Sequence, residues 1–252
     1  MGQFITTHEE ISNAGRGPSH ELWGDCPRDE IKNDFSAGWY FEDDFMNGIG
    51  TTDSARYAIT NATAGTFLMD DAQGGVALAD SASTDATKGI NVQLADGSTG
   101  ERFIPVANSD IWFEARVKAA DMATGPQFFL GLSEISETIL ASSLNTSANH
   151  IGFESVSDNG VLLIQGEKAG TRNSALDSPH TLVDDTYVKL GFKVTGVTKV
   201  EFYVDGVVKA TQLATANIPI LALTPSLVCQ SGGTTDPIVH IDWWAAYQEY
   251  RL

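Results

Sequence analysis

The chain has 252 residues, of which 42% are hydrophobic and 19% charged, so it can bury a core in one large domain or two small ones. Its formal net charge of −18 would repel nucleic-acid phosphates, which argues against DNA or RNA as a partner. No apolar run approaches the roughly 20 residues of a membrane-spanning helix, and no basic and apolar leader opens the chain, so neither a membrane segment nor a secretory signal is expected.

Residues 1–38 show no sustained strand alternation. Thr7 and Glu10 fit a capping box, and Gly15 would end the helix that this box begins. Pro27 can open a second helical turn that runs to Asp34. Apolar side chains occur singly here and share no face, so the pattern predicts an extended N-terminal arm with short helical turns and no core of its own.

Residues 39–252 follow a β pattern almost throughout and are expected to form one domain. One helix, over residues 136–145, is expected among the strands. Many short strands separated by turn residues indicate an all-β, antiparallel jelly-roll sandwich. The expected strands cover residues 39–45, 74–80, 88–95, 101–107, 111–120, 126–134, 150–156, 160–167, 186–194, 197–213, 220–229 and 238–250.

The clearest single element is a β-hairpin over residues 197–213. Apolar and polar residues alternate along its first strand, and Asp205-Gly206 is a two-residue turn signal. That turn places Val204 opposite Val207 and Tyr203 opposite Val208. Both faces of the hairpin then carry apolar side chains, which is typical of an inner strand of a packed sheet.

The order of the strands resembles the concanavalin A-like lectin/glucanase superfamily. The resemblance rests on "WFEARVKAAD", "FFLGLSE", "YVKLGFKV", "VEFYVDGVVK" and the closing "HIDWWAAYQ", and the family-16 glycoside hydrolases end in a similar way. The segments "HELWGDCP", "YFEDDF", "FEARVK" and "GL…IGF" are similar, in order, to tailed-phage structural proteins built on the same jelly roll. This second resemblance implies a virion component, a capsid decoration protein.

No catalytic site is expected, and the chain is interpreted as not being an enzyme. Family-16 hydrolases carry their acids near a Glu-x-Asp-x-x-Glu pattern, and the nearest match here is Glu134-Ile135-Ser136-Glu137. Glu134 and Glu137 are three residues apart, so on a regular strand they point to opposite faces and cannot flank one glycosidic bond.

No cofactor is required by any motif, and the five histidines have no metal-ligand spacing, so no metal site is assigned. A structural calcium ion stays an alternative. Glu42 and Asp44 share a face of one strand, and the superfamily resemblance implies that Asp242 would tie the last strand to the same ion. Solvated acids or ion pairs with Arg116 or Lys189 are the other interpretation.

The sequence therefore predicts a capsid decoration protein on the exterior of a virion, made in the host cytoplasm. Its partners would be the major capsid protein and further copies of itself, as a trimer or dimer. The expected partner-binding residues are apolar side chains of the arm: Phe4, Ile5, Trp23, Ile31 and Phe35. Two alternatives stay open on the same fold. One is a carbohydrate-binding module or host-surface adhesin that binds a glycan, and the other is a glycoside hydrolase.

Overall fold

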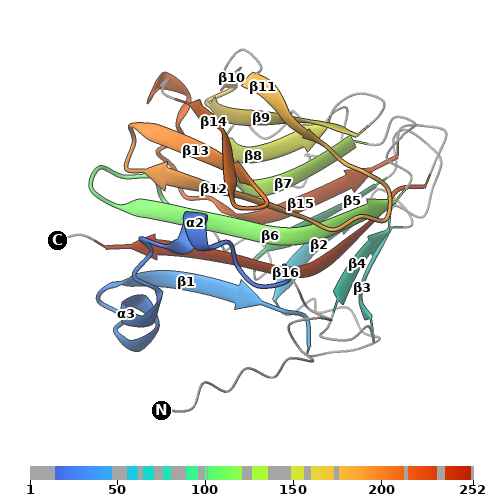
Figure 1. The fold of residues 1–252 in the computed structure, drawn as a ribbon, viewed down its shortest axis with the longest axis horizontal. Helices are drawn as coiled ribbons and strands as arrows, with labels where there is room; N and C mark the ends of the chain where they lie inside the picture. Colours follow the sequence, from blue (N-terminus) through green and yellow to red (C-terminus); the bar gives the residue numbers. More distant parts are fainter. Residues whose placement is uncertain are drawn as a thin grey trace.

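The computed structural model describes residues 15–46, 56–61, 65–70, 76–80, 89–95, 100, 102–120, 127–135, 149–155, 160–172, 176–212, 215–231 and 236–250. Two antiparallel sheets stack face to face, which confirms the predicted jelly-roll sandwich (Figure 1). The elements are α2 (His20–Trp23), α3 (Arg28–Asn33), β1 (Gly38–Asp43), β2 (Tyr57–Asn61), β3 (Thr66–Asp70), β4 (Val76–Asp80), β5 (Gly89–Leu94), β6 (Asp110–Ala120), β7 (Gln127–Ser133), β8 (His150–Ser155), β9 (Val161–Lys168), β10 (Thr171–Arg172), β11 (Leu176–Thr181), β12 (Val188–Thr195), β13 (Lys199–Val204), β14 (Val207–Gln212), η2 (Thr215–Asn217), β15 (Thr224–Gln230) and β16 (Ile238–Glu249).

The first sheet, called sheet A, has the order β14-β13-β12-β6-β16-β4-β3, and β1 pairs with the other half of β16. The second, called sheet B, has the order β10-β9-β8-β7-β15-β5-β2, and β11 also pairs with β9. Helices α2 and α3 lie on the side of sheet A that faces away from sheet B (Figure 1). No helix in the described part of the chain is long and apolar enough to cross a membrane.

The core lies between the sheets and is supplied by alternate residues of each strand. On β6, Phe113, Ala115 and Val117 point into the core, whereas Trp112 points to the outer face of sheet A. Phe113 stacks on Phe192 of the neighbouring strand β12 at a centroid distance of 5.0 Å. This period-two pattern is the one the sequence predicted.

The predicted hairpin is confirmed, register included. Val204 pairs with Val207, and Tyr203 pairs with Val208, across a turn in which Asp205 and Gly206 both have positive φ. The expectation of an inner position holds for β13 but not for β14, which ends the strand order of sheet A. Val207 and Val208 are accordingly exposed.

The described part of the arm, residues 15–37, lies on the outer face of sheet A. The prediction that its apolar side chains share no face is wrong for Leu22, Trp23 and Ile31, which are buried together against the sheet. Their partners, with which they form what is called the arm cluster below, are Trp112, Tyr203, Trp243, Ala245 and Tyr247.

The helical turn expected after Pro27 is present as α3, and α2 forms where extended or turning chain was expected. The helices expected over residues 7–15 and 136–145 lie outside the described residues, apart from Gly15. Strand β1 begins at Gly38, next to the predicted boundary between arm and sandwich.

The arm is attached to sheet A at a buried carboxylate, Glu114 of β6. One oxygen, Oε2, accepts hydrogen bonds from the indole N–H of Trp23 at 2.6 Å and from the backbone N–H of Ser19 at 3.0 Å. The other oxygen has no hydrogen-bond partner. Nearby, Leu22 packs closely on Gly191 of β12. A Cβ added at Gly191 would lie 2.5 Å from Cδ2 of Leu22. The arm therefore fits a surface shaped for it.

Candidate functional site on the outer face of sheet B

The strand β8 carries a group of polar side chains on the face of sheet B that points away from the core. Its sequence, His-Ile-Gly-Phe-Glu-Ser, alternates in type, and Ile151 and Phe153 belong to the core. His150, Gly152 and Glu154 therefore share the opposite, outer face. A strand with apolar residues on one side only would normally show its other side to water, but here every residue of β8 is buried.

Neighbouring strands place further functional groups beside these residues. Glu167 of β9 is directly opposite His150, and its Oε2 lies 4.0 Å from Nε2 of the imidazole. On the other side, Phe129 of β7 is opposite Glu154. The Phe129 ring meets the His150 ring edge to face, with the centroids 5.4 Å apart. The outer face thus brings two carboxylates, one imidazole and one aromatic ring together.

Two glycines lie side by side in the middle of this face. Gly131 of β7 pairs with Gly152 of β8, so neither of these two strands carries a side chain at this row. A Cβ at Gly152 would lie 2.9 Å from Cε2 of Phe129, so the absent side chain makes room for the Phe129 ring. That ring lies between the positions of His150 and Glu154 along β8.

A hydrogen-bond network beside His150 fixes the adjoining strands. The side-chain amide of Gln93 donates to the hydroxyl oxygens of Ser133 and Ser226, each at 3.0 Å, and to the backbone carbonyl of Glu134 at 3.0 Å. The two hydroxyls are 2.8 Å apart. Ser133 is the β7 partner of His150, so this network lies next to the imidazole. It links the strands β5, β7 and β15 by side-chain hydrogen bonds.

The face is closed in this structure. Glu154 is 0% exposed, His150 2% and Glu167 3%. Any ligand of these groups must therefore displace what covers them.

Of the acids that the sequence singled out, Glu134 and Glu137, the structure describes only Glu134. Glu134 follows the end of β7, where its Oε2 accepts a hydrogen bond from Asn149 at 2.9 Å, and Glu137 lies outside the described residues. The signal that was missed is the alternation over residues 150–154, which places one carboxylate and one imidazole four residues apart on one face. The sequence analysis interprets these residues only as part of an expected strand.

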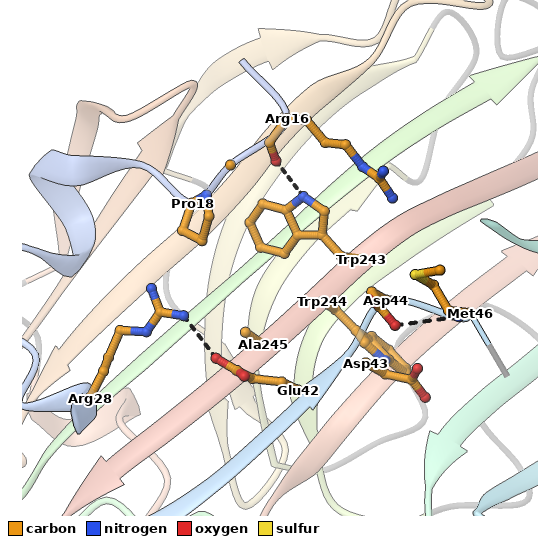
Figure 2. A pocket seen from close by; sticks show the side chains of 11 residues that line it. Arg16, Pro18, Arg28, Glu42, Asp43, Asp44, Met46, Trp243, Trp244 and Ala245 are labelled. Carbon is orange, nitrogen blue, oxygen red and sulfur yellow. Dashed lines mark hydrogen bonds and ion pairs between the residues drawn. The ribbon is translucent and has the colours of Figure 1, made fainter. Parts of the chain in front are cut away.

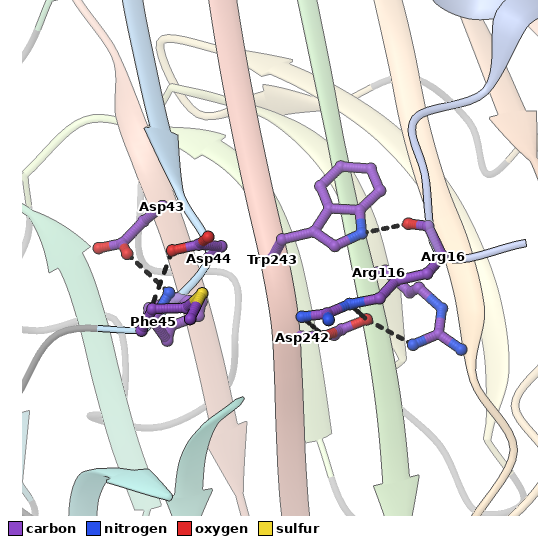
Figure 3. Close-up of polar contacts among 8 residues, drawn as sticks. Arg16, Asp43, Asp44, Phe45, Arg116, Asp242 and Trp243 are labelled. Atoms are coloured by element: carbon purple, nitrogen blue, oxygen red, sulfur yellow. Dashed lines mark hydrogen bonds and ion pairs between the residues drawn. The ribbon is translucent and has the colours of Figure 1, made fainter. Parts of the chain in front are cut away.

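Of the three acids considered for calcium, Asp242 and Glu42 are held by cations, and Asp44 accepts a hydrogen bond from the backbone N–H of Met46 at 3.3 Å. Asp242 is the extra residue of a bulge in β16 and forms ion pairs with Arg16 at 2.6 Å and Arg116 at 2.5 Å (Figure 3). Glu42 pairs with Arg28 and Lys32. Over the described residues, no three His, Cys, Asp or Glu side chains are placed to hold a metal ion. The alternative that the sequence left open, an ion pair of Asp242 with Arg116, is the arrangement observed.

A pocket of about 570 Å³ lies between the arm and the end of β1. Trp243 and Ala245 of β16 form its floor, with Arg16 and Pro18 on the arm side (Figure 2). The Trp243 indole N–H donates to the carbonyl of Arg16 at 2.6 Å. Arg16, Arg28 and Glu42 at this pocket are engaged in the ion pairs given above. Asp43 pairs with Arg56, and Asp44 accepts a hydrogen bond from the backbone N–H of Met46. The pocket lies where the arm meets the sheet.

The five predicted partner-binding residues fall into three groups. Trp23 and Ile31 are buried in the arm cluster, Phe35 is 82% exposed at the turn between α3 and β1, and Phe4 and Ile5 lie outside the described residues. In this structure the side chains of Trp23 and Ile31 are buried against sheet A. Of the described three, only Phe35 has an exposed side chain.

Comparison with known proteins supports the fold and does not assign a family. No protein-family model and no curated protein matches the chain. The structure is similar to an endo-1,3-beta-glucanase from Streptomyces sioyaensis, with TM-score 0.57 and 17% identity over 82% of this chain and 95% of that one. It is also similar to a beta-glucanase from Bacillus licheniformis, with TM-score 0.56 and 13% identity over 85% and 99%. A protein of unknown function from Shewanella oneidensis MR-1 aligns over 100% of this chain and 99% of that one, with TM-score 0.57 and 14% identity.

These similarities support the concanavalin A-like jelly-roll fold. They also correct the prediction that the chain is not an enzyme, because many of its structural neighbours are glucanases and lichenases. The predicted capsid role receives no support from them. At 12–17% identity the likeness reaches the fold alone, so the activity has to be argued from the residues of this chain.

Proposed function

We propose that the chain is a glycoside hydrolase that acts on a glucan, with the outer face of sheet B as its site. The observation that carries the proposal is the placement of Glu154 and Glu167 on adjacent strands of that face, beside His150. Cleavage of a glycosidic bond needs one group to protonate the leaving oxygen and a second group to act on the other side of the sugar. The glucanase names of the structural neighbours support the substrate class.

The register of β8 and β9 limits how these two carboxylates can work. Glu154 is opposite Leu163, and Glu167 is opposite His150. Four residues along a strand span about 13 Å, and the side chains can close only part of that distance. The arrangement is therefore unlike the spacing of about 5 Å that a covalent sugar–enzyme intermediate needs, and it leaves room for a water molecule.

The burial of this face affects the choice of substrate. His150, Glu154 and Glu167 are covered in the structure, so a short soluble oligosaccharide should reach them more readily than an insoluble fibre. Phe129 offers an aromatic ring at the centre of the face, against which one sugar ring can pack.

The test is release of reducing sugar from soluble β-1,3- and mixed-linkage β-1,3-1,4-glucans and their oligosaccharides. Wild-type protein should release sugar, and Glu154→Gln should lose the activity while keeping the circular dichroism spectrum and melting temperature. Glu201→Gln is the matched control, because Glu201 lies on sheet A and pairs with Lys199. No release by wild-type protein from any of these substrates would reject the proposal.

A second candidate function, contact with a capsid shell, is favoured by one exposed surface. Phe35 is 82% and Trp39 39% exposed at the start of β1, and with Tyr40 and Phe41 they line a pocket of about 300 Å³. Exposed aromatic side chains of this kind are typical of protein interfaces. On this proposal the partner is the major capsid protein or a neighbouring copy in a dimer or trimer, and the chain lies on the virion exterior.

This second candidate is tested by binding to capsid particles and by light scattering. Phe35→Ala combined with Trp39→Ala should lower occupancy on the shell and shift the mass toward the monomer. Val207→Ala, at an exposed apolar residue of β14, is the control. If the double variant binds particles at full occupancy and keeps its mass, this surface is not the interface.

A further inference from the structure

We infer that the arm is a pH-sensitive cover of sheet A, whose attachment weakens when the carboxyl group of Glu114 loses its proton. The inference concerns the arm and does not depend on sugar release. It starts from two buried oxygen atoms at the attachment, Oε1 of Glu114 and Oγ of Ser19. Among the described residues, neither atom has a hydrogen-bond partner of ordinary geometry. Glu114 is 0% exposed and Ser19 3%.

Both hydrogen bonds that the arm makes to Glu114 go to the same oxygen. Oε2 accepts from the indole N–H of Trp23 and from the backbone N–H of Ser19. In the ionised form, Oε1 therefore carries part of a negative charge in a place closed to water, which costs free energy. A proton on Oε1 removes this charge, leaves both bonds to Oε2 in place and turns Oε1 into a donor close to the Ser19 hydroxyl. The attached arm thus fits the neutral carboxylic acid better than the carboxylate.

The burial of Glu114 depends on the arm. Glu114 points to the outer face of sheet A, because its neighbours Phe113 and Ala115 point into the core. Its partners on the flanking strands are small, Gly191 on β12 and Ala245 on β16, so the sheet itself offers little cover. The arm supplies that cover, with Leu22 packed on Gly191. When the arm lifts, the carboxyl group meets water and its pKa returns toward the usual value.

The direction of the pH effect follows from this difference between the two states. Burial raises the pKa of Glu114 above its usual 4.5 while the arm is attached, although the contacts with Ser19, Trp23 and Lys189 act in the opposite direction. The arm should be held most firmly below pH 4.5, and its hold should weaken as the pH rises through the raised value. Each pH unit between the two pKa values should lower the equilibrium constant for attachment about tenfold.

Other ionisable groups on the arm and on sheet A face the same region and have to be separated from Glu114. They are Arg16, His20, Glu21, Asp25, Cys26 and Arg28 of the arm, Asp110 and Arg116 of β6, Lys189 and Lys193 of β12, Glu201 and Tyr203 of β13, Asp205 of the following turn, and Asp242 and Tyr247 of β16. Histidine is the residue type whose unperturbed pKa lies between pH 5 and pH 8. His20, an exposed residue of α2, is therefore the alternative that the experiment has to exclude.

Amide hydrogen exchange from about pH 4 to about pH 8, corrected for the intrinsic rate at each pH, tests the inference. The reporters are the backbone N–H groups of Trp23 and Ile31, which donate to the carbonyls of Ser19 and Pro27 at 3.0 Å each. In the wild type their protection should fall about tenfold per pH unit above 4.5 and level off at the raised pKa, while the amides of β6 keep theirs.

Glu114→Gln separates the charge from the shape of the side chain, because it keeps an acceptor oxygen and adds a donor. Protection of the arm in this variant should stay constant over the same pH range. His20→Gln is the matched control and should show the wild-type fall. Constant protection in the wild type, an unchanged fall in Glu114→Gln, or loss of the fall in His20→Gln would each overturn the inference.

A measurement on the wild type carries the test where Glu114→Gln does not fold. Carbon NMR of the Glu114 carboxyl group gives its titration midpoint in the intact protein. The midpoint should lie above pH 4.5, at the pH where the protection of Trp23 and Ile31 stops falling. A midpoint at or below 4.5, or one unrelated to the exchange of the arm, would mean that Glu114 does not control the arm.

Discussion

Replacing Trp23 by alanine tests whether the arm is part of the folded domain. Trp23 is 6% exposed, contacts Tyr247 edge to face at 5.5 Å, and lies under the guanidinium of Arg28 at 5.2 Å. Truncation of such a buried aromatic side chain costs about 3–5 kcal/mol. The change also removes one of the two hydrogen bonds to the buried carboxylate of Glu114, which adds about 1–3 kcal/mol.

We therefore expect Trp23→Ala to lower the free energy of unfolding by at least about 3 kcal/mol. In a chain of this length each kcal/mol shifts the melting temperature by about 2–4 °C, so the midpoint should fall by about 6 °C or more. Urea and thermal denaturation followed by far-UV circular dichroism measure both quantities. That signal does not depend on the indole that is removed.

Phe35→Ala is the matched control. Phe35 lies on the same arm but is 82% exposed, so its removal should change the free energy of unfolding by no more than about 0.5 kcal/mol. The sequence, read without the structure, predicted that Trp23→Ala would hardly change the melting temperature, because Trp23 was expected to contact a partner. A shift as small as that of Phe35→Ala would refute the reasoning from the arm cluster.

Three further outcomes follow from the described contacts. Burial raises the pKa of Glu114 above its usual 4.5. A raised folded-state pKa contributes stability that is present below pH 4.5 and is lost as the pH rises through the folded-state pKa, so the stability of Glu114→Gln relative to wild type should increase as the pH rises above 4.5, measured by urea titration at each pH. Asp242→Asn should cost up to about 3 kcal/mol, because Arg16 and Arg116 lose their shared carboxylate, and EDTA should leave the melting temperature of the wild type unchanged. Gly206→Ala should cost about 1 kcal/mol or more in thermal denaturation, since its φ is +78° and a Cβ would lie 2.8 Å from a carboxylate oxygen of Glu21; a variant as stable as wild type would contradict this.

The sandwich could be predicted because its signals are local. Alternation along residues 111–120 fixes which side of β6 enters the core, and Asp205-Gly206 fixes the hairpin register. In the same way, the adjacent pairs Trp112-Phe113 and Trp243-Trp244 each place one ring in the core and one outside. Each of these inferences needs only the neighbours along one strand.

The covering of sheet A by the arm could not be predicted in this way. Leu22, Trp23 and Ile31 have no common period, because α2 is one turn long and the chain bends between α2 and α3. They lie on one face only because they contact residues of sheet A that are about 90 to 225 positions away in the sequence, such as Glu114 and Tyr247. The signal that was missed lies in the sequence of the sheet. Trp112 and Trp243 point away from the core, with the carboxylate of Glu114 on β6 between them. Such large side chains on an outer face indicate that another segment of the chain packs over them.

The two candidate functions use different parts of the molecule, and this decides how they can be separated. The proposed hydrolase site is on the outer face of sheet B, whereas Phe35 and Trp39 lie next to or at the start of β1, an element of sheet A. Because the two places lie on different sheets, the effects of changes at them should add. Glu154→Gln should then remove sugar release without affecting particle binding, and the Phe35 and Trp39 changes should do the reverse. A variant at one place that alters both readouts would mean that the effect comes from folding, which the melting temperature of the same sample would show.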